Sequence, residues 1–150
     1  MKLMILSMKV MLADDSDYVR LSLRKMLSRN PMIDGIIEAE TISKAKEVLE
    51  LEMPDVLILD LSFPEGSGFE VLGYARAKGL VKIIVILTNY PGSPMKNRSF
   101  REGADFFFDK SNEFMKVIDV INKLSKDCTV GDTNEGIGSG TEQQEISAMN

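Results

Sequence analysis

Residues 55–68 read DVLILDLSFPEGSG. The run VLIL at 56–59 follows Pro54 and leads through Asp60 into a segment with Pro64 and two glycines. A short run of Val, Ile and Leu between turn residues predicts a strand that is buried on both faces, as in a parallel sheet. Asp60 then has two interpretations. It either starts the turn, a position that suits Asp, or it presents a reactive carboxylate at the edge of the sheet.

The other apolar runs repeat this pattern along the chain. Together with 56–59 they are KVMLA at 9–13, GIIEA at 35–39, IIVIL at 83–87 and DFFF at 105–108. Apolar residues at helical spacing occupy the segments 19–27, 42–49, 69–75, about 94–103, and 114–124. Five strand–helix units without hairpin signals predict an α/β fold, a flavodoxin-like doubly wound (βα)5 domain. Its five-stranded parallel sheet should have the order 2-1-3-4-5.

Length and composition narrow the class of protein. The 150 residues, 44% hydrophobic and 27% charged, suit one globular domain. The absence of histidine excludes a Ser-His-Asp triad and the usual zinc ligands. A single cysteine, Cys128, cannot form an internal disulfide, which favours the cytoplasm. No apolar stretch is long enough to span a membrane.

Charge divides the chain into three parts. We expect an N-terminal extension at 1–7, or a true start at Met8, then a domain at 8–126 and a disordered acidic tail at 127–150. Residues 1–126 are neutral, because all 18 Lys and Arg and 18 of the 23 Asp and Glu lie there. The tail carries the whole net charge of −5 and is rich in Gly, Ser and Thr. Nothing in the chain forms the basic patch that direct nucleic-acid binding requires.

The carboxyl ends of the predicted strands gather polar residues. These are Asp14 and Asp15 after the first, Asp60 after the third, Thr88 after the fourth and Lys110 after the fifth. Ligands of doubly wound sheets bind at these ends. Two carboxylates about 5 Å apart repel by roughly 3 kcal/mol at an effective dielectric of about 20. Three carboxylates against one lysine therefore predict a bound cation, and all-oxygen ligands favour Mg²⁺.

The order and spacing of these motifs resemble the receiver domain of two-component response regulators. The resemblance covers residues 8–126 and rests on Asp14-Asp15, on DLSFPEGSGFEVL, on Thr88 and on GADFFFDK ending in Lys110. It implies a stand-alone, chemotaxis-type receiver that accepts a phosphoryl group on Asp60. The donor would be a sensor histidine kinase or a phosphotransfer protein.

The resemblance also implies roles for individual residues. Asp15, Asp60 and the carbonyl of Ser62 would hold Mg²⁺, with Asp14 acting through water. Thr88 and Lys110 would bind the phosphoryl oxygens, and Phe107 would be a rotating aromatic switch. The output would be a changed protein-binding surface on the fourth helix, fifth strand and fifth helix. It would be read by an unidentified downstream protein or by a homodimer that depends on phosphorylation.

Other functions and interpretations remain open at this point. An Mg²⁺-dependent phosphohydrolase with an aspartate nucleophile is the main alternative, although Ser62 stands where such enzymes usually carry a second carboxylate. A flavin-binding carrier is a further option, but Asp14 and Asp15 would repel the cofactor's phosphate. The receiver would be no enzyme beyond self-phosphorylation and self-dephosphorylation. The two aspartates also suit a plain helix cap.

Overall fold

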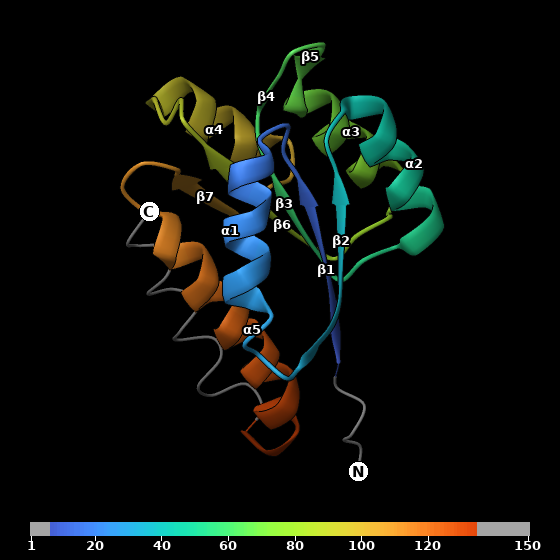
Figure 1. Ribbon diagram of the computed structural model, residues 1–150, viewed down its shortest axis with the longest axis vertical. Coiled ribbons are helices and arrows are strands. Elements are labelled where there is room, and N and C mark those ends of the chain that lie inside the picture. Colours follow the sequence, from blue (N-terminus) through green and yellow to red (C-terminus); the bar gives the residue numbers. More distant parts are fainter. Residues whose placement is uncertain (1–6, 135–150) are drawn as a thin grey trace.

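One parallel sheet with helices on both faces makes up the protein (Figure 1). The computed structural model describes residues 7–134. The sheet strands are β1 (Met8–Ala13), β2 (Ile33–Ala39), β3 (Val56–Leu59), β6 (Ile83–Thr88) and β7 (Phe106–Asp109). The helices are α1 (Asp17–Leu27), α2 (Ile42–Glu52), α3 (Gly68–Lys78), α4 (Ser93–Arg101) and α5 (Phe114–Asn134). The strand order β2-β1-β3-β6-β7 confirms the predicted 2-1-3-4-5 sheet.

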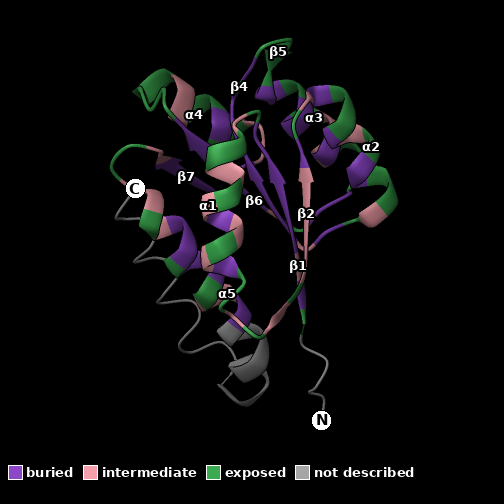
Figure 2. Cartoon of the chain, in the orientation of Figure 1, coloured by how far each residue is buried: buried purple, intermediate pink, exposed green. Residues whose placement is uncertain are grey.

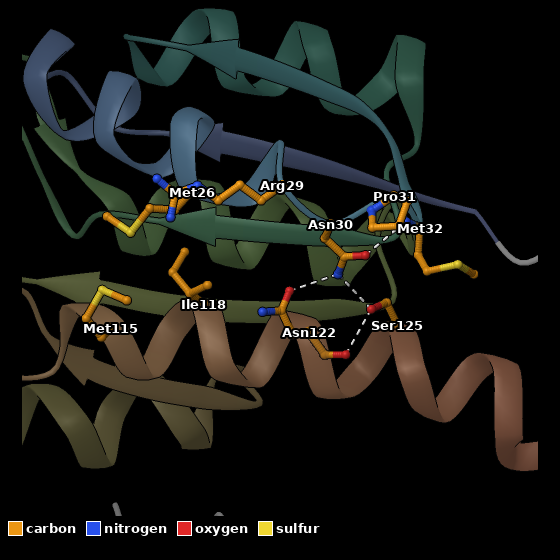
Figure 3. Close-up of a pocket in the computed structure, with 9 residues that line it drawn as sticks. All are labelled: Met26, Arg29, Asn30, Pro31, Met32, Met115, Ile118, Asn122 and Ser125. Atoms are coloured by element: carbon orange, nitrogen blue, oxygen red, sulfur yellow. Dashed lines mark hydrogen bonds between the residues drawn. The ribbon is translucent and has the colours of Figure 1, made fainter.

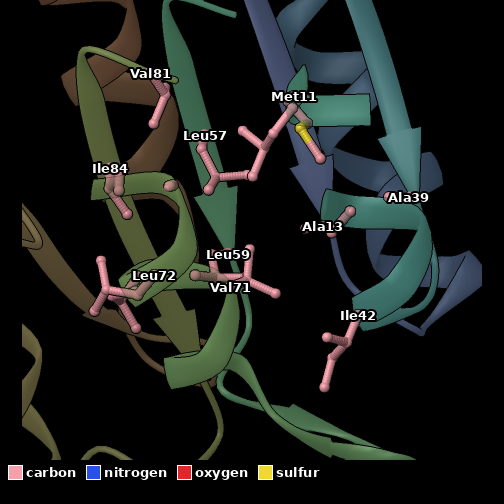
Figure 4. Close-up of a cluster of buried hydrophobic side chains, with 14 of the residues drawn as sticks. Met11, Ala13, Ala39, Ile42, Leu57, Leu59, Val71, Leu72, Val81 and Ile84 are labelled. Carbon is pink, nitrogen blue, oxygen red and sulfur yellow. The ribbon is translucent and has the colours of Figure 1, made fainter. Parts of the chain in front are cut away.

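Alternation along the strands separates two hydrophobic cores, one on each face of the sheet (Figure 2). Side chains such as Leu57, Leu59 and Ile86 meet α2 and α3, in the cluster drawn in Figure 4. Their sequence neighbours point the other way, toward α1 and α5. Successive side chains of a strand point to opposite faces of the sheet. Because helices cover both faces, a run such as VLIL must be apolar throughout.

The helices begin and end where local chemistry favours it. Ser16 caps α1 by accepting a hydrogen bond from Val19 N at 3.2 Å, and Thr41 and Ser67 cap α2 and α3 in the same way. Asp14 and Asp15 are therefore not the helix cap that sequence alone left open. Gly79 ends α3 in the left-handed conformation, with φ of 63°, where glycine carries no steric penalty.

Several boundaries differ from the sequence expectations. Residues 62–67 form a small hairpin of β4 (Ser62–Phe63) and β5 (Gly66–Ser67), which the sequence did not predict. Pro64 suits the tight turn of this hairpin because its fixed φ matches the first central turn position. Among the outer strands, β2 starts two residues before the apolar run at 35–39, and β7 starts one residue after the beginning of the run at 105–108.

The end of α5 lies beyond the predicted domain boundary at 126. Residues 127–134, which the sequence assigns to the acidic tail, are part of α5 as the structure has it, since this helix runs to Asn134. Extending an existing helix needs no new nucleus, so a polar segment can follow the amphipathic one without a break. The rest of the predicted tail, and residues 1–6 of the predicted extension, lie outside the described residues. Within residues 7–134, no helix has the length and hydrophobicity needed to cross a membrane.

Gly68 brings the start of α3 into direct contact with the segment that follows β3. Its backbone N donates a hydrogen bond to Leu61 O at 2.9 Å. A Cβ atom at this position would lie 2.0 Å from the carbonyl oxygen of Asp60. Only glycine permits this approach, so Gly68 fixes how closely α3 packs beneath Asp60.

Gly68→Ala should therefore destabilise the protein by at least about 2 kcal/mol, because the backbone of α3 or of Asp60 must move to admit the methyl group. Gly73→Ala is the matched control, since a Cβ there would meet no atom within 4 Å apart from its chain neighbours and the backbone of its own helix. It should stabilise the fold by about 0.5 to 1 kcal/mol through helix propensity. Urea unfolding of both variants measures the difference. Equal free energies of unfolding for the two variants would show that the start of α3 can move away from Asp60 without cost.

Candidate functional site: an acidic cluster at the carboxyl ends of the strands

The central strands place two aspartates side by side. Ala13 of β1 pairs with Leu59 of β3, so the residues that follow each strand emerge at the same edge. Asp60 N donates a hydrogen bond to Ala13 O at 3.0 Å, and Asp14 N donates to Ala39 O at 3.1 Å. Backbone hydrogen bonds of the sheet therefore hold both acidic residues in place, even though their carboxylates repel each other.

Three carboxylates converge at this edge. Oxygen atoms of Asp14, Asp15 and Asp60 lie within 4.8 Å of one another. Asp14 and Asp60 are buried, with 4% and 5% of their surface exposed, whereas Asp15 is exposed. Lys110 Nζ bridges the buried pair at 2.7 Å from Asp14 Oδ2 and 3.1 Å from Asp60 Oδ2. The local charge is thus negative, with one ammonium against three carboxylates.

Burial and like charge act on the titration of this cluster. Burial raises the pKa of the Asp60 carboxyl, and the charge of Asp14 raises it further, while Lys110 opposes both effects. Burial also disfavours the charged ammonium of Lys110. Hydrogen bonds and charges from Asp14 and Asp60 outweigh that effect, so the pKa of Lys110 is raised. The charged form of Asp60 is therefore held in the fold at a cost.

The cluster opens into a hollow of about 370 Å³. Asp15, Asp60 and Lys110 line it, together with residues of the β4 segment and the loop after β6: Ser62, Phe63, Pro64, Asn89 and Tyr90. Ser62 N donates a hydrogen bond to Asp60 Oδ1 at 3.3 Å. Tyr90 is 59% exposed at the rim. The Asp60 carboxylate thus lies at the wall of a solvent-filled hollow although the residue itself is buried.

Thr88 and Phe107 do not line this hollow. Thr88 ends β6 fully buried, and its hydroxyl oxygen accepts a hydrogen bond from Tyr90 N at 3.1 Å. Phe107 of β7 is 3% exposed and belongs to the core on the α2 and α3 face, against which Met95 of α4 also packs. Because Thr88 pairs with Asp109 and Ile86 with Phe107, Thr88 and Phe107 point to the same face of the sheet.

The donor set fits a hard divalent cation. All the side-chain ligands on offer are carboxylate oxygens, one of them exposed and facing the hollow, which suits an ion that keeps several of its waters. One lysine cannot neutralise three carboxylates at this separation. A divalent ion would restore the balance without displacing Lys110.

A family model for the response regulator receiver domain matches residues 10–122. The chain belongs to this family. The match takes in β1 from Val10 onward, the other four strands of the sheet and all the residues of the acidic cluster. The fold and the resemblance recognised in the sequence are both confirmed.

Curated relatives extend beyond the receiver. The sensory transduction protein LytT of Enterococcus faecalis is 28% identical over 120 residues, which cover 80% of this chain and 49% of that protein. The transcriptional regulatory protein YhcZ of Bacillus subtilis is 31% identical over 106 residues, covering 71% and 50% respectively. The chain thus spans about half the length of these relatives. It covers 88% of an uncharacterised 14.6 kDa protein of Leptolyngbya boryana at 28% identity.

Solved structures share the architecture. A two-component response regulator of the LuxR family from Aurantimonas sp. superposes with a TM-score of 0.71 at 26% identity, covering 80% of this chain and 86% of that one. The receiver domain of a Luxo repressor protein from Vibrio parahaemolyticus superposes with a TM-score of 0.74 at 24% identity, covering 87% of this chain and 99% of that one. At this level of identity, the comparison with the Vibrio protein shows a shared fold and nothing more.

Sequence reasoning missed a group of charged residues behind the acidic cluster of this receiver. Arg20 of α1 donates to the carbonyl oxygen of Asp14 at 2.6 Å and to Glu38 of β2 at 2.9 Å. Arg24 also pairs with Glu38. One signal was present in the sequence, since Glu38 is a lone acid in the apolar run at 35–39 and a part-buried acid needs a cation.

A larger hollow, of about 420 Å³, lies between α1 and α5 and away from the carboxylates (Figure 3). Its apolar wall includes Met26, Met115 and Ile118. At one end Asn30 Nδ2 donates hydrogen bonds to Asn122 Oδ1 and Ser125 Oγ, tying the loop after α1 to α5. It contains none of the residues that the sequence predicts for the site.

Asp60→Asn should stabilise the metal-free receiver at neutral pH, because burial and the charge of Asp14 disfavour the ionised Asp60 carboxylate in the fold. The folded-state pKa of Asp60 lies above the unfolded-state value. As the pH rises, the unfolded chain therefore loses its proton first, and the wild type loses stability through that window. Lys110 keeps Asp14 as a partner in the variant.

Urea unfolding from about pH 4 to 7 in the presence of a chelator provides the measurement. The advantage of the variant should shrink as the pH falls toward the raised pKa of Asp60. A variant that is less stable than the wild type at pH 7 would mean that the Lys110–Asp60 ion pair outweighs the repulsion. Asp34→Asn, at an exposed position of β2, controls for general loss of an acid.

Proposed function

We propose that Asp60 accepts a phosphoryl group from a phosphohistidine on a sensor histidine kinase or phosphotransfer protein, in a reaction that requires Mg²⁺. The observation that supports this most strongly is the buried Asp60 carboxylate facing the hollow between Asp15 and Lys110. A carboxylate oxygen of Asp60 would attack phosphorus. The new phosphorus–oxygen bond forms as the phosphorus–nitrogen bond to the donor imidazole breaks, and the imidazole takes the electron pair.

The residues around Asp60 suit the charge that develops in this transfer. Asp14, Asp15 and Asp60, with the carbonyl of Ser62, would hold the metal, Asp14 through water. When bound, Mg²⁺ supplies positive charge against the phosphoryl oxygens. Lys110 would exchange its contact with Asp60 for a phosphoryl oxygen while it stays anchored on Asp14 at 2.7 Å. Such an ammonium needs little reorganisation, which is the advantage of a preorganised site.

Phosphorylation would then alter the surface formed by α4, β7 and α5. Phosphorylation adds charge and strong acceptor oxygens at Asp60. The Thr88 hydroxyl accepts one hydrogen bond at present and has its own proton to donate. If it turned toward the phosphoryl group, the ring of Phe107, on the same face, could move into the space it leaves beneath α4. A downstream protein or a second copy of the chain would read the change in this surface.

The signalling role is favoured over a phosphohydrolase. Position 62 carries an exposed serine at the start of the β4–β5 hairpin, where that alternative needs an acid. A lone phosphoacceptor would turn over a small-molecule donor only as fast as its own acyl phosphate hydrolyses. The cytoplasm remains the proposed setting, because the proposed kinase partner would supply phosphoryl groups from ATP there.

Incubation with acetyl phosphate and Mg²⁺ should add one phosphoryl group to the wild type, sensitive to hydroxylamine and detected by intact mass. Asp60→Asn should show none, because the nucleophile is lost. Asp34→Asn is the matched control and should label like the wild type. Labelling retained in Asp60→Asn would move the acceptor elsewhere, and continuous release of phosphate without an acyl phosphate would support the hydrolase.

A beryllofluoride complex with Mg²⁺, which mimics the acyl phosphate, should change the amide chemical shifts at Thr88, Tyr90, Phe107 and along α4. The Thr88→Ala variant should still bind the mimic but lose most of the response at Phe107 and α4, since its hydroxyl starts the rearrangement. ¹H–¹⁵N spectra of both proteins provide the comparison. Shifts confined to Asp14, Asp15, Asp60 and Lys110 would describe a site that binds phosphate and does not switch.

A further inference from the structure

Arg20 lies directly behind the metal-binding edge and touches no part of the hollow. We infer that Arg20 is a positioning residue, which holds the Asp14–Asp15 peptide in the orientation that the divalent cation requires. This inference rests on the proposed function. It adds to that function a residue from outside the acidic cluster, on α1, and a partner on β2.

The guanidinium of Arg20 joins three elements. Its side chain is only 11% exposed. One nitrogen donates to Asp14 O at 2.6 Å, the Nε donates to Glu38 Oε1 at 2.9 Å, and another nitrogen pairs with Asp17. A planar fork with fixed donor directions can serve three acceptors at once, whereas a lysine ammonium on a flexible stem cannot reproduce that geometry.

The contact to Asp14 O controls the neighbouring ligand. That carbonyl belongs to the planar peptide unit joining Asp14 to Asp15, so fixing its direction fixes where the chain places Asp15. Asp14 itself is held further by Ala39 O, by Ser16 N on Oδ1 at 2.9 Å and by Lys110 on Oδ2. The side chain of Asp15 makes no hydrogen bond or ion pair within residues 7–134. The exposed ligand therefore depends on its backbone for its position.

The charge of Arg20 does not explain the arrangement. Asp17 and Glu38 both pair with it, so the group adds no net positive charge to the site. Electrostatics and geometry predict opposite results when Arg20 is replaced by a neutral residue. Loss of a positive charge would tighten cation binding, because two carboxylates lose their partner. Loss of the fixed peptide would weaken it, as removal of outer partners of metal ligands commonly does.

Arg24 supplies a matched control. It lies one helical turn further along α1 and pairs with the same Glu38, but it has no contact with Asp14. Arg20→Lys and Arg24→Lys keep the charge, and Arg20→Gln and Arg24→Gln remove it. Within each pair of variants the same change is made to a residue that pairs with Glu38, so general effects on stability are shared. Only the Arg20 variants release the Asp14 carbonyl.

Mg²⁺ titration of the four variants and the wild type, followed by calorimetry and by ¹H–¹⁵N spectra, tests the inference. We expect Arg20→Lys and Arg20→Gln to raise the dissociation constant about tenfold, the lower end of the usual range for outer partners of metal ligands. The Arg24 variants should stay within about twofold of the wild type. In metal-free protein, the amide signals of Asp15 and Ser16 should shift and broaden only in the Arg20 variants.

The outcomes separate this inference from the function on which it rests. Wild-type affinity in the Arg20→Lys variant with unchanged Asp15 and Ser16 signals would overturn the positioning role and leave the proposed function intact. Tighter Mg²⁺ binding by Arg20→Gln would overturn it too, in favour of a charge effect. Failure of the wild type to bind Mg²⁺ would overturn the proposed metal site and the role of Arg20 with it.

Discussion

Repulsion among three carboxylates that the backbone forces together is the constraint around which this receiver is built. Asp14 and Asp60 cannot separate, because the ladder between β1 and β3 and their own backbone hydrogen bonds fix their positions. Both are buried, and burial raises the pKa of Asp60. Lys110 offsets part of the repulsion and no more. The site therefore keeps an excess of negative charge, which a bound divalent cation would offset.

The rest of the domain supplies the stability that this arrangement costs. Two apolar cores on opposite faces of the sheet bury nearly all of the central strand residues (Figure 2). Close contacts such as that of Gly68 with Asp60 O fix the loop geometry around the site. Ile42 N at the start of α2 donates a hydrogen bond to Glu65 of the hairpin at 3.0 Å, so the segment after Asp60 is anchored at its far end as well. Rigid surroundings keep the acidic residues close in the absence of a ligand.

The same alternation that divides the cores also decides which residues of the last two strands face α4. Thr88 and Phe107 lie on one face of the sheet, the face on which Met95 of α4 packs. Phe106 and Phe108 lie on the other, with their rings stacked 6.3 Å apart beneath α5. In the proposed switch, a rearrangement at Thr88 would therefore reach α4 through packed side chains. The chain spans about half the length of its curated relatives. These relatives include a transcriptional regulatory protein, which carries further sequence beyond the receiver.

The sequence by itself determined the fold class and the strand order, because buried strands must be apolar throughout. It also indicated that Asp14, Asp15, Asp60 and Lys110, which follow those strands directly, would meet at one edge of the sheet. It did not predict the β4–β5 hairpin or the extent of α5, since turn pairing and helix propagation depend on marginal local energies. Only the tertiary structure could reveal the Arg20 contact with Asp14 O. Residues 14, 20 and 38 come from three elements, and nothing in their spacing indicates that a guanidinium would join a carbonyl to a carboxylate across them.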